Sequence, residues 1–127
     1  MLKQIISTSK APAPIGPYSQ AVKSGSFLYI SGQIPINPET GNLVMEDIRS
    51  ETNCVMNNLK AILDEAGLNF GHVVKTTIFL SDMSLFPQVN EVYAGFFTHD
   101  FPARETVAVA GLPKGVNVEI SVIACFS

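Results

Sequence analysis

Charge is sparse in this sequence, and its basic residues do not cluster. Charged residues make up 15% of the 127 positions, and 8 Lys and Arg stand against 11 Asp and Glu, which gives a formal charge of -3. Proteins that bind nucleic acids or anionic membranes neutralise phosphates with grouped Lys and Arg. We therefore expect neither a nucleic acid nor a membrane as a partner.

Long apolar runs are also missing. The opening residues Met1–Thr8 carry one charge and only a short apolar stretch, which is too little for a signal peptide. No run approaches the ~18 apolar residues of a membrane-spanning helix. These absences predict a soluble, cytoplasmic protein.

Cysteine and histidine occur only twice each. Cys54 and Cys125 lie far apart and match neither a CxxC motif nor a zinc spacing, so we expect both to be reduced and buried. His72 and His99 have no paired ligands at the spacings that metal sites use. The sequence therefore predicts no metal.

Motifs for nucleotide binding and for nucleophilic catalysis are absent as well. There is no Gly-rich phosphate loop and no Gly-x-Ser-x-Gly elbow, and neither histidine has a nucleophile at a suggestive spacing. We expect no cofactor and no catalysis of the Ser/His/Asp or Cys/His kind.

What is present is apolar sequence of a length that suits one core. Apolar residues make up 46% of the chain, and the mean hydropathy is +0.27. A chain of this size and composition folds as a single globular domain rather than remaining disordered. We therefore interpret residues 1–127 as one domain.

Two segments show helical periodicity. Apolar or small residues recur at spacings of four and three over residues 46–66, and Gly67 supplies a stop. A second helix is predicted over residues 84–97, where Pro87 is tolerated because it falls in the first turn.

Five segments have the composition of strands, and turn-forming residues separate them. The predicted strands span residues 19–23, 27–31, 72–80, 103–110 and 116–126. Segments rich in Pro and Gly predict loops and turns at residues 11–17, 24–26, 35–41 and 111–115.

This order of elements is not a strict alternation of strand and helix. It favours a two-layer α+β sandwich, with a mixed sheet and two helices on one face. The other face of the sheet would be wet or paired with another subunit, and a chain with so little charge favours pairing. We therefore expect an oligomer.

The last two predicted strands carry a cation and an anion. If they form a hairpin whose valines, Val107 and Val109 included, face the core, then Arg104 and Glu119 share the outer face as cross-strand or diagonal neighbours. One interpretation is a surface salt bridge worth ~0–1 kcal/mol. The other is a site in which the arginine fork grips a carboxylate and the glutamate orients water or accepts a proton.

Five blocks spread along the whole chain give the sequence a family resemblance. The chain closely resembles the Rid (YjgF/UK114) family of reactive-intermediate or imine deaminases, and the blocks are Ile15–Ala21, Ser31–Pro35, Lys75–Leu80, Phe101–Arg104 and Val118–Ile120.

The resemblance implies a fold, an assembly and an activity. The implied fold is chorismate-mutase-like, and the implied assembly is a homotrimer whose sheets form a central barrel, with active sites in the clefts between subunits. The implied activity is the hydrolysis of 2-imino and enamine acids, such as 2-iminobutanoate and 2-iminopropanoate, to 2-oxo acids and ammonia, without a cofactor.

The resemblance also assigns roles to particular residues. Arg104 falls at the family arginine that binds the substrate carboxylate, and Glu119 at the family glutamate associated with the attacking water. Tyr18, Ser31 and Gly32 match pocket positions. From the residues alone, Gly32 is a strand-end glycine and Tyr18 a packing residue beside a proline turn.

The sequence departs from the family pattern at two positions after the arginine. Thr106 stands where many members carry cysteine, which indicates that its contribution to substrate binding runs through the backbone. Glu105 stands where most members carry a small residue, and its charge could draw Arg104 away from substrate. Strand alternation predicts instead that Glu105 points to the opposite face.

Two other functions compete with the deaminase. One is a small-molecule carboxylate-binding or regulatory protein on the same trimeric scaffold, because a fold does not determine a function. The other is an endoribonuclease or translation inhibitor, which the acidic balance and the missing basic cluster disfavour.

Overall fold

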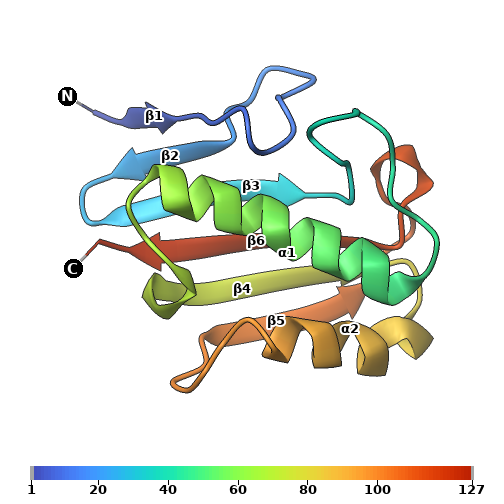
Figure 1. Ribbon diagram of the computed structural model, residues 1–127. Helices are drawn as coiled ribbons and strands as arrows, with labels where there is room; N and C mark the ends of the chain where they lie inside the picture. Colours follow the sequence, from blue (N-terminus) through green and yellow to red (C-terminus); the bar gives the residue numbers. More distant parts are fainter. Residues whose placement is uncertain (1, 127) are drawn as a thin grey trace.

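The computed structural model describes residues 2–126, which form one six-stranded sheet with two α-helices packed against one face (Figure 1). The expected two-layer α+β architecture is confirmed. The strands are β1 (Gln4–Ile6), β2 (Ala21–Ser24), β3 (Phe27–Gln33), β4 (Val73–Leu80), β5 (Ala103–Ala108) and β6 (Val118–Cys125), and the helices are α1 (Ile48–Glu65) and α2 (Phe86–Ala94). Single 3-10 turns lie at Phe70–His72, Met83–Leu85 and Pro113–Gly115.

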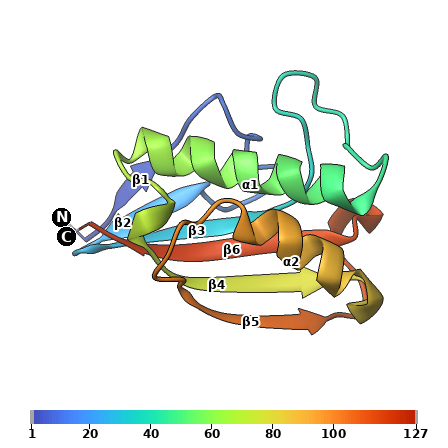
Figure 2. The ribbon, with the colours of Figure 1, turned by 60° about the horizontal axis from the view of Figure 1, so that its bottom comes forward.

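The sheet is mixed, and its strand order is β1-β2-β3-β6-β4-β5 (Figure 2). The β4–β5 pair is parallel, and the other neighbouring pairs are antiparallel. Strand β6 therefore lies inside the sheet, between β3 and β4, although it is the last strand in the sequence.

Helix α1 begins and ends where local chemistry predicts. The side chain of Asp47 accepts a hydrogen bond of 2.8 Å from the backbone N–H of Ser50, and this bond lowers the pKa of the Asp47 carboxyl. Gly67, with a φ of 78°, ends the helix as expected. Its buried stripe includes Thr52, Val55, Leu59 and Ile62 of the predicted periodic positions.

Helix α2 covers the sheet beside α1, and Pro87 lies in its first turn as expected. Val89 and Tyr93 are buried, and the Tyr93 hydroxyl donates a hydrogen bond of 2.9 Å to Thr76 Oγ1 on β4. Burial raises the pKa of the Tyr93 hydroxyl. The hydrogen bond satisfies two buried hydroxyl groups and ties α2 to the sheet.

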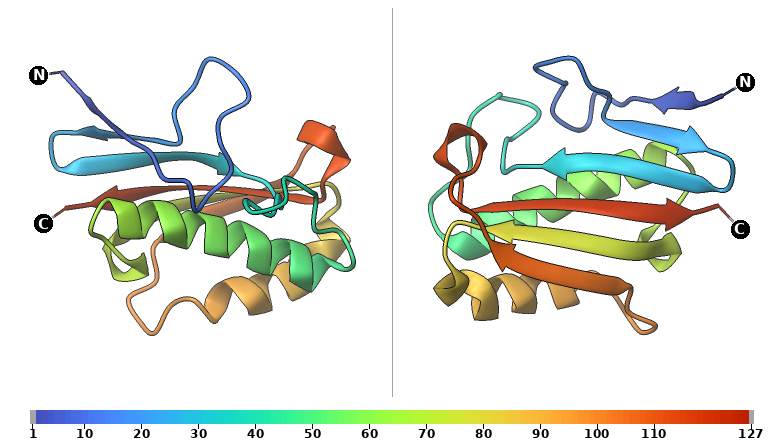
Figure 3. Two further views of the ribbon diagram at one scale, coloured as in Figure 1. Left: turned by 45° about the horizontal axis from the view of Figure 1, so that its top comes forward. Right: turned by 180° about the vertical axis from the view of Figure 1, so that it is seen from behind.

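The face of the sheet away from the helices is uncovered, as Figure 3 shows from behind. Large apolar side chains from neighbouring, paired strands lie on this face. Among them, Ile5, Phe27, Tyr29 and Val107 are 41 to 50% exposed. We call this surface, together with Phe79 and Ile123, the open face. A monomeric protein rarely exposes so continuous an apolar surface.

The prediction that the last two strands form a hairpin is wrong. Residues 109–117 carry the chain past the end of β4, where Val109 N–H donates to Leu80 O and Ser81 N–H donates to Asn117 O. Strand β6 then enters between β3 and β4, and β5 stays at the edge as a parallel partner of β4. Parallel strands need a crossover, which helix α2 supplies here.

The cysteines are thiols as expected, but the prediction that they are buried is wrong, because Cys54 and Cys125 are both partly exposed. Cys54 Sγ donates to Ile36 O at 3.4 Å, and its partial burial raises the pKa of the thiol.

Two features are absent from residues 2–126. No cluster of three or more His, Cys, Asp or Glu side chains there is arranged to hold a metal ion. No helix in that range is long and apolar enough to cross a membrane.

Candidate active site

The carboxyl group of Glu119 lies on the open face and packs against Gly32 of β3. A side chain at position 32 would place its Cβ 2.2 Å from Glu119 Oε2 and 3.0 Å from its Cγ. Only glycine leaves room for the glutamate in this position. The strand-end glycine therefore makes a close approach that its place in the sequence does not reveal.

A break in strand pairing creates the space around this contact. The register of β3 against β6 shifts between Ile30 and Gln33, so Ser31 and Gly32 lie in an irregular stretch. Ser31 Oγ donates a hydrogen bond of 2.6 Å to Ser19 O, and Ser31 N–H donates to Gln20 O at 2.9 Å. These bonds join the irregular stretch to the segment that carries Tyr18.

The Glu119 cleft, as we name this space, has a volume of about 360 Å³. Its lining comprises Tyr18, Ser31, Gly32 and Glu119, with Ile15, Ile34 and Pro113 as apolar walls. The structure thus brings together four of the six site residues predicted from the sequence. Tyr18 is half exposed, and its hydroxyl accepts a long hydrogen bond of 3.4 Å from Ile15 N–H.

Burial in this apolar setting raises the pKa of Glu119 above its ordinary value. Phe79 is its neighbour on β4 in the sheet, and no ion pair with Glu119 is formed by a described residue. A carboxyl group with a raised pKa is suited to exchange a proton with a bound water.

Arg104 lies on the other side of the sheet, in a second cleft. It pairs with Thr76, whose side chain faces the helices, and its Nη1 donates a hydrogen bond of 2.7 Å to Asn90 Oδ1 on α2. The guanidinium carbon stands 5.3 Å from the ring centre of Phe86 and 5.1 Å from that of Tyr93. These contacts hold the guanidinium over α2 by cation–π attraction.

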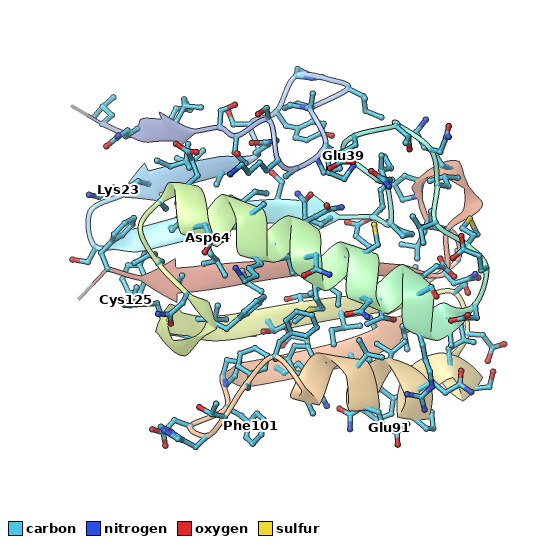
Figure 4. The ribbon with its side chains drawn as sticks, viewed as in Figure 1. Lys23, Glu39, Asp64, Glu91, Phe101 and Cys125 are labelled. Carbon is cyan, nitrogen blue, oxygen red and sulfur yellow. The ribbon has the colours of Figure 1, made fainter. Side chains whose placement is uncertain are left out.

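The Arg104 cleft has a volume of about 430 Å³, and its lining includes Asn90, Tyr93, Phe101 and Pro102. Figure 4 places Phe101 in the loop between α2 and β5. None of the carboxyl groups described in the structure forms an ion pair with Arg104. The guanidinium is therefore an exposed cation, and its N–H groups that do not donate to Asn90 are available to a ligand.

The expectation that Arg104 and Glu119 share one face is wrong. Arg104 pairs with Thr76 on the helix side of the sheet, whereas Glu119 pairs with Phe79 on the open face. The interpretation of a surface salt bridge between them is wrong for the same reason. Val107 also faces outward rather than into the core, because it pairs with Phe79, whose side chain is on the open face.

Glu105 points away from Arg104, as strand alternation predicts. Its Oε2 accepts a hydrogen bond of 3.0 Å from Thr77 Oγ1 and lies 3.1 Å from Lys75 Nζ. The bonds from Lys75 and Thr77 lower the pKa of Glu105. The Glu105 carboxylate is therefore bound by Lys75 and Thr77 on the open face, and it does not compete with a substrate carboxylate for the Arg104 guanidinium.

Thr106 lies on β5 two residues after Arg104 and lines neither cleft. Its Oγ1 is buried and has no hydrogen-bond partner in the structure. It pairs with Ile78 and therefore faces the helices, on the same side as Arg104. An unsatisfied buried hydroxyl costs stability, and no contact in one chain explains it.

Asn90 is a neighbour of Arg104 that the sequence did not single out. Phe86, Asn90 and Tyr93 follow one another at spacings of four and three, which places them on one face of α2. That periodicity is visible in the sequence. The sequence does not show which strand residue this face of α2 meets, because that depends on the pairing of β5 with β4.

Comparison with known proteins gives a clear result. A family model described as Endoribonuclease L-PSP matches residues 8–126. The chain belongs to this family. The expected membership of the Rid (YjgF/UK114) family is confirmed, since a solved structure of a Rid-family protein of unknown function, YyfA from Yersinia pestis, is 52% identical with a TM-score of 0.95. That match covers 97% of this chain and 98% of the other.

Two other relatives carry more specific names. The 2-iminobutanoate/2-iminopropanoate deaminase of Mus musculus is 48% identical over 98% of this chain and 92% of its own length. The structure of TdcF from E. coli with bound serine is 43% identical, has a TM-score of 0.94, and is covered over 98% and 99% of the two chains.

Proposed function

We propose that this protein hydrolyses small 2-imino acids and their enamine tautomers, such as 2-iminobutanoate and 2-iminopropanoate, to 2-oxo acids and ammonia. The observation that carries the proposal is the Glu119 carboxyl, held against Gly32 in a cleft that raises its pKa. The name of the mouse relative and the exposed, unpaired guanidinium of Arg104 support the same substrate class.

The chemistry requires little from the protein because a protonated imine is already electrophilic. Glu119 holds a water and accepts its proton as the oxygen adds to the C=N carbon. The proton then passes to the amine nitrogen of the resulting carbinolamine. The C–N bond breaks as Glu119 accepts the hydroxyl proton, which leaves a 2-oxo acid and ammonia, and Glu119 then gives this proton to solvent.

Arg104 and Tyr18 have the roles of orienting groups in this proposal. The planar guanidinium grips the substrate carboxylate through two parallel hydrogen bonds, with Asn90 fixing its direction. Tyr18, Ser31, the backbone N–H of Gly32 and the backbone of Thr106 complete the substrate contacts. Orientation of a reactive substrate beside a placed water accounts for much of the rate gain.

The proposed site is composite, because Arg104 and Glu119 of one chain face different clefts on opposite sides of the sheet. We therefore propose a homotrimer that covers the open face and places Arg104, on the edge strand β5 of one copy, at the Glu119 cleft of the next. The apolar side chains of the open face support this assembly, since Phe27, Tyr29 and Val107 are each more than 40% exposed in one chain.

An RNA substrate is not favoured, despite the description of the family model. Of the eight basic residues, Arg49, Lys60 and Lys75 are paired with carboxylates, and the formal charge is -3. A footprint for phosphates would require grouped, unpaired cations.

The deciding experiment generates 2-iminobutanoate in situ with a threonine dehydratase and traps the remaining imine with semicarbazide. We expect the wild-type protein to accelerate imine loss and the Glu119→Gln variant to do so poorly. No acceleration at micromolar protein contradicts the proposal. Binding of 2-oxobutanoate by calorimetry without any rate effect would point instead to a carboxylate-binding or regulatory protein.

A further inference from the structure

Glu51 is a buried acidic side chain that the proposed reaction does not use. It lies in the first turn of α1 and is 2% exposed. Both of its carboxyl oxygens accept hydrogen bonds from one residue, Asn117, from the backbone N–H at 3.1 Å and from Nδ2 at 2.8 Å. A buried carboxyl group is costly unless its oxygens are satisfied, so this arrangement is specific.

Asn117 is held from a second direction by the end of β4. Ser81 Oγ donates a hydrogen bond of 2.8 Å to Asn117 Oδ1, and Ser81 N–H donates one of 3.0 Å to Asn117 O. The three residues Glu51, Asn117 and Ser81 form what we call the anchor. It joins the first turn of α1, the start of β6 and the end of β4, which lie together in Figures 1 and 2.

The anchor lies where the sheet itself holds β6 least. Pairing of β6 with β3 ends at Ile120, because the register shift leaves Gln33 as its last partner. Glu119 is therefore paired only with Phe79 of β4. Asn117, which donates two hydrogen bonds to Glu51, lies two positions before Glu119.

The loop before Asn117 adds to the need for a fixed point. Lys114 and Gly115 both have a positive φ, of 56° and 68°, and Pro113 forms a wall of the Glu119 cleft. Because Lys114 is not a glycine, its positive φ is strained, and such a conformation persists only where the surrounding contacts fix it. The anchor terminates this loop on its β6 side.

The tolerance for movement at Glu119 is small. Its carboxyl oxygen occupies the space that a Cβ at position 32 would take. A shift of β6 toward β3 would therefore press the carboxyl group against the backbone of Gly32, and a shift away would break its contact with Gly32. We infer that Glu51 is a positioning residue: through Asn117 it sets where β6 begins and so where the Glu119 carboxyl stands. This inference rests on the proposed function for its catalytic consequence, but the placement of Glu119 is measurable without it.

The test compares three variants of the full chain with the wild type. Glu51→Leu keeps the side-chain volume but removes both acceptors, and we expect kcat to fall between about tenfold and a hundredfold, with KM within about threefold. KM is spared because Arg104, which is not connected to the anchor, still binds the carboxylate. Glu51→Gln should stay within about threefold of wild type in kcat, because a turned Asn117 amide satisfies a glutamine, accepting from Gln Nε2 and donating to Ser81 Oγ.

Leu63→Ala serves as the matched control for stability. Leu63 is fully buried in the last turn of α1, at the other end from the anchor, and its truncation lowers Tm without touching Glu51, Asn117 or Ser81. We expect its kcat at 25 °C to stay within about twofold of wild type. If Glu51→Leu does not fold, Asn117→Ala replaces it, since it keeps the backbone N–H bond and loses only the amide.

A spectroscopic readout separates this inference from the proposed function. The α-protons of Gly32 and the γ-protons of Glu119 are close enough for an NOE, and we expect it to weaken in Glu51→Leu and to persist in Leu63→Ala and Glu51→Gln. If the wild type is inactive on imines, the proposed function fails and the NOE alone decides. Equal losses of Tm in Glu51→Leu and Leu63→Ala, with kcat and NOE unchanged in both, would overturn the inference.

Discussion

Arg104 and Glu119 emerge from opposite faces of one sheet, Arg104 beside Thr76 toward α2 and Glu119 beside Phe79 on the open face. No rotamer change within one chain moves a side chain through a hydrogen-bonded sheet. If both act on one substrate, they must come from different copies of the chain, and this relationship has a direct consequence for mixed assemblies.

Mixing Arg104→Ala with Glu119→Gln should restore activity that neither variant has alone. After dissociation and random reassembly, about three quarters of trimers are mixed and each holds one complete site of three, so about one quarter of wild-type activity returns. Light scattering checks that each sample has three times the 13.7 kDa chain mass. A mixture no more active than its components, or a stable monomer, would rule out the composite site.

Arg104→Ala should lower kcat/KM by about two orders of magnitude or more, because hydrogen bonds to charged groups contribute roughly 1.5–3 kcal/mol each. Arg104→Lys should recover little, since an ammonium cannot form the paired bonds of the fork. Steady-state kinetics and thermal melts are measured together for both variants.

The neighbouring acid provides the control for that series. Glu105→Gln should leave kcat/KM nearly unchanged, because the Glu105 side chain contacts Lys75 and Thr77, does not line the Glu119 cleft, and can keep its Thr77 contact as glutamine. Near wild-type kinetics in an Arg104→Ala protein that melts like wild type would show that the carboxylate site lies elsewhere.

The pH dependence of kcat/KM should show an acidic limb set by Glu119. Its pKa is raised by burial and its ionised form accepts the proton, so activity rises with pH through a midpoint above that of an ordinary glutamate. The same shift makes the contribution of Glu119 to stability largest below its unfolded pKa and smaller as pH rises through the folded value. Glu119→Gln should abolish the limb, and a limb that survives this substitution would assign it to another group.

Gly32→Ala should fold but lose activity. The φ of Gly32 lies outside the left-handed region, so the backbone accepts alanine, but the new Cβ would stand 2.2 Å from Glu119 Oε2 and displace the carboxyl group. We expect kcat to fall about tenfold or more, which corresponds to ~1.4 kcal/mol. The double variant Gly32→Ala/Glu119→Gln should be no worse than Glu119→Gln alone; additive losses would separate the two residues.

Local sequence chemistry predicted both α-helices and five of the six strands, with ends within two or three residues of the observed ones. The short strand β1 was not predicted. The periodicity of residues 46–66 with Gly67, the turn around Gly25, and Pro87 in a first turn each act within a few residues, so the sequence alone suffices to predict them. The family blocks likewise identified Tyr18, Ser31, Gly32 and Glu119, which the structure gathers in one cleft.

Only the tertiary structure decided which strands are neighbours and therefore which face each site residue occupies. Alternation separates Arg104 from Glu105 correctly, but the face that meets the helices depends on whether β5 pairs with β6 or with β4. That choice is made by the packing of α2 across the sheet and by the passage of residues 109–117 past Ser81, which are contacts between residues far apart in the chain. The burial of Glu51 against Asn117, 66 positions away, is of the same kind: no local pattern marks a glutamate whose hydrogen-bond partner lies just before the last strand of the sequence.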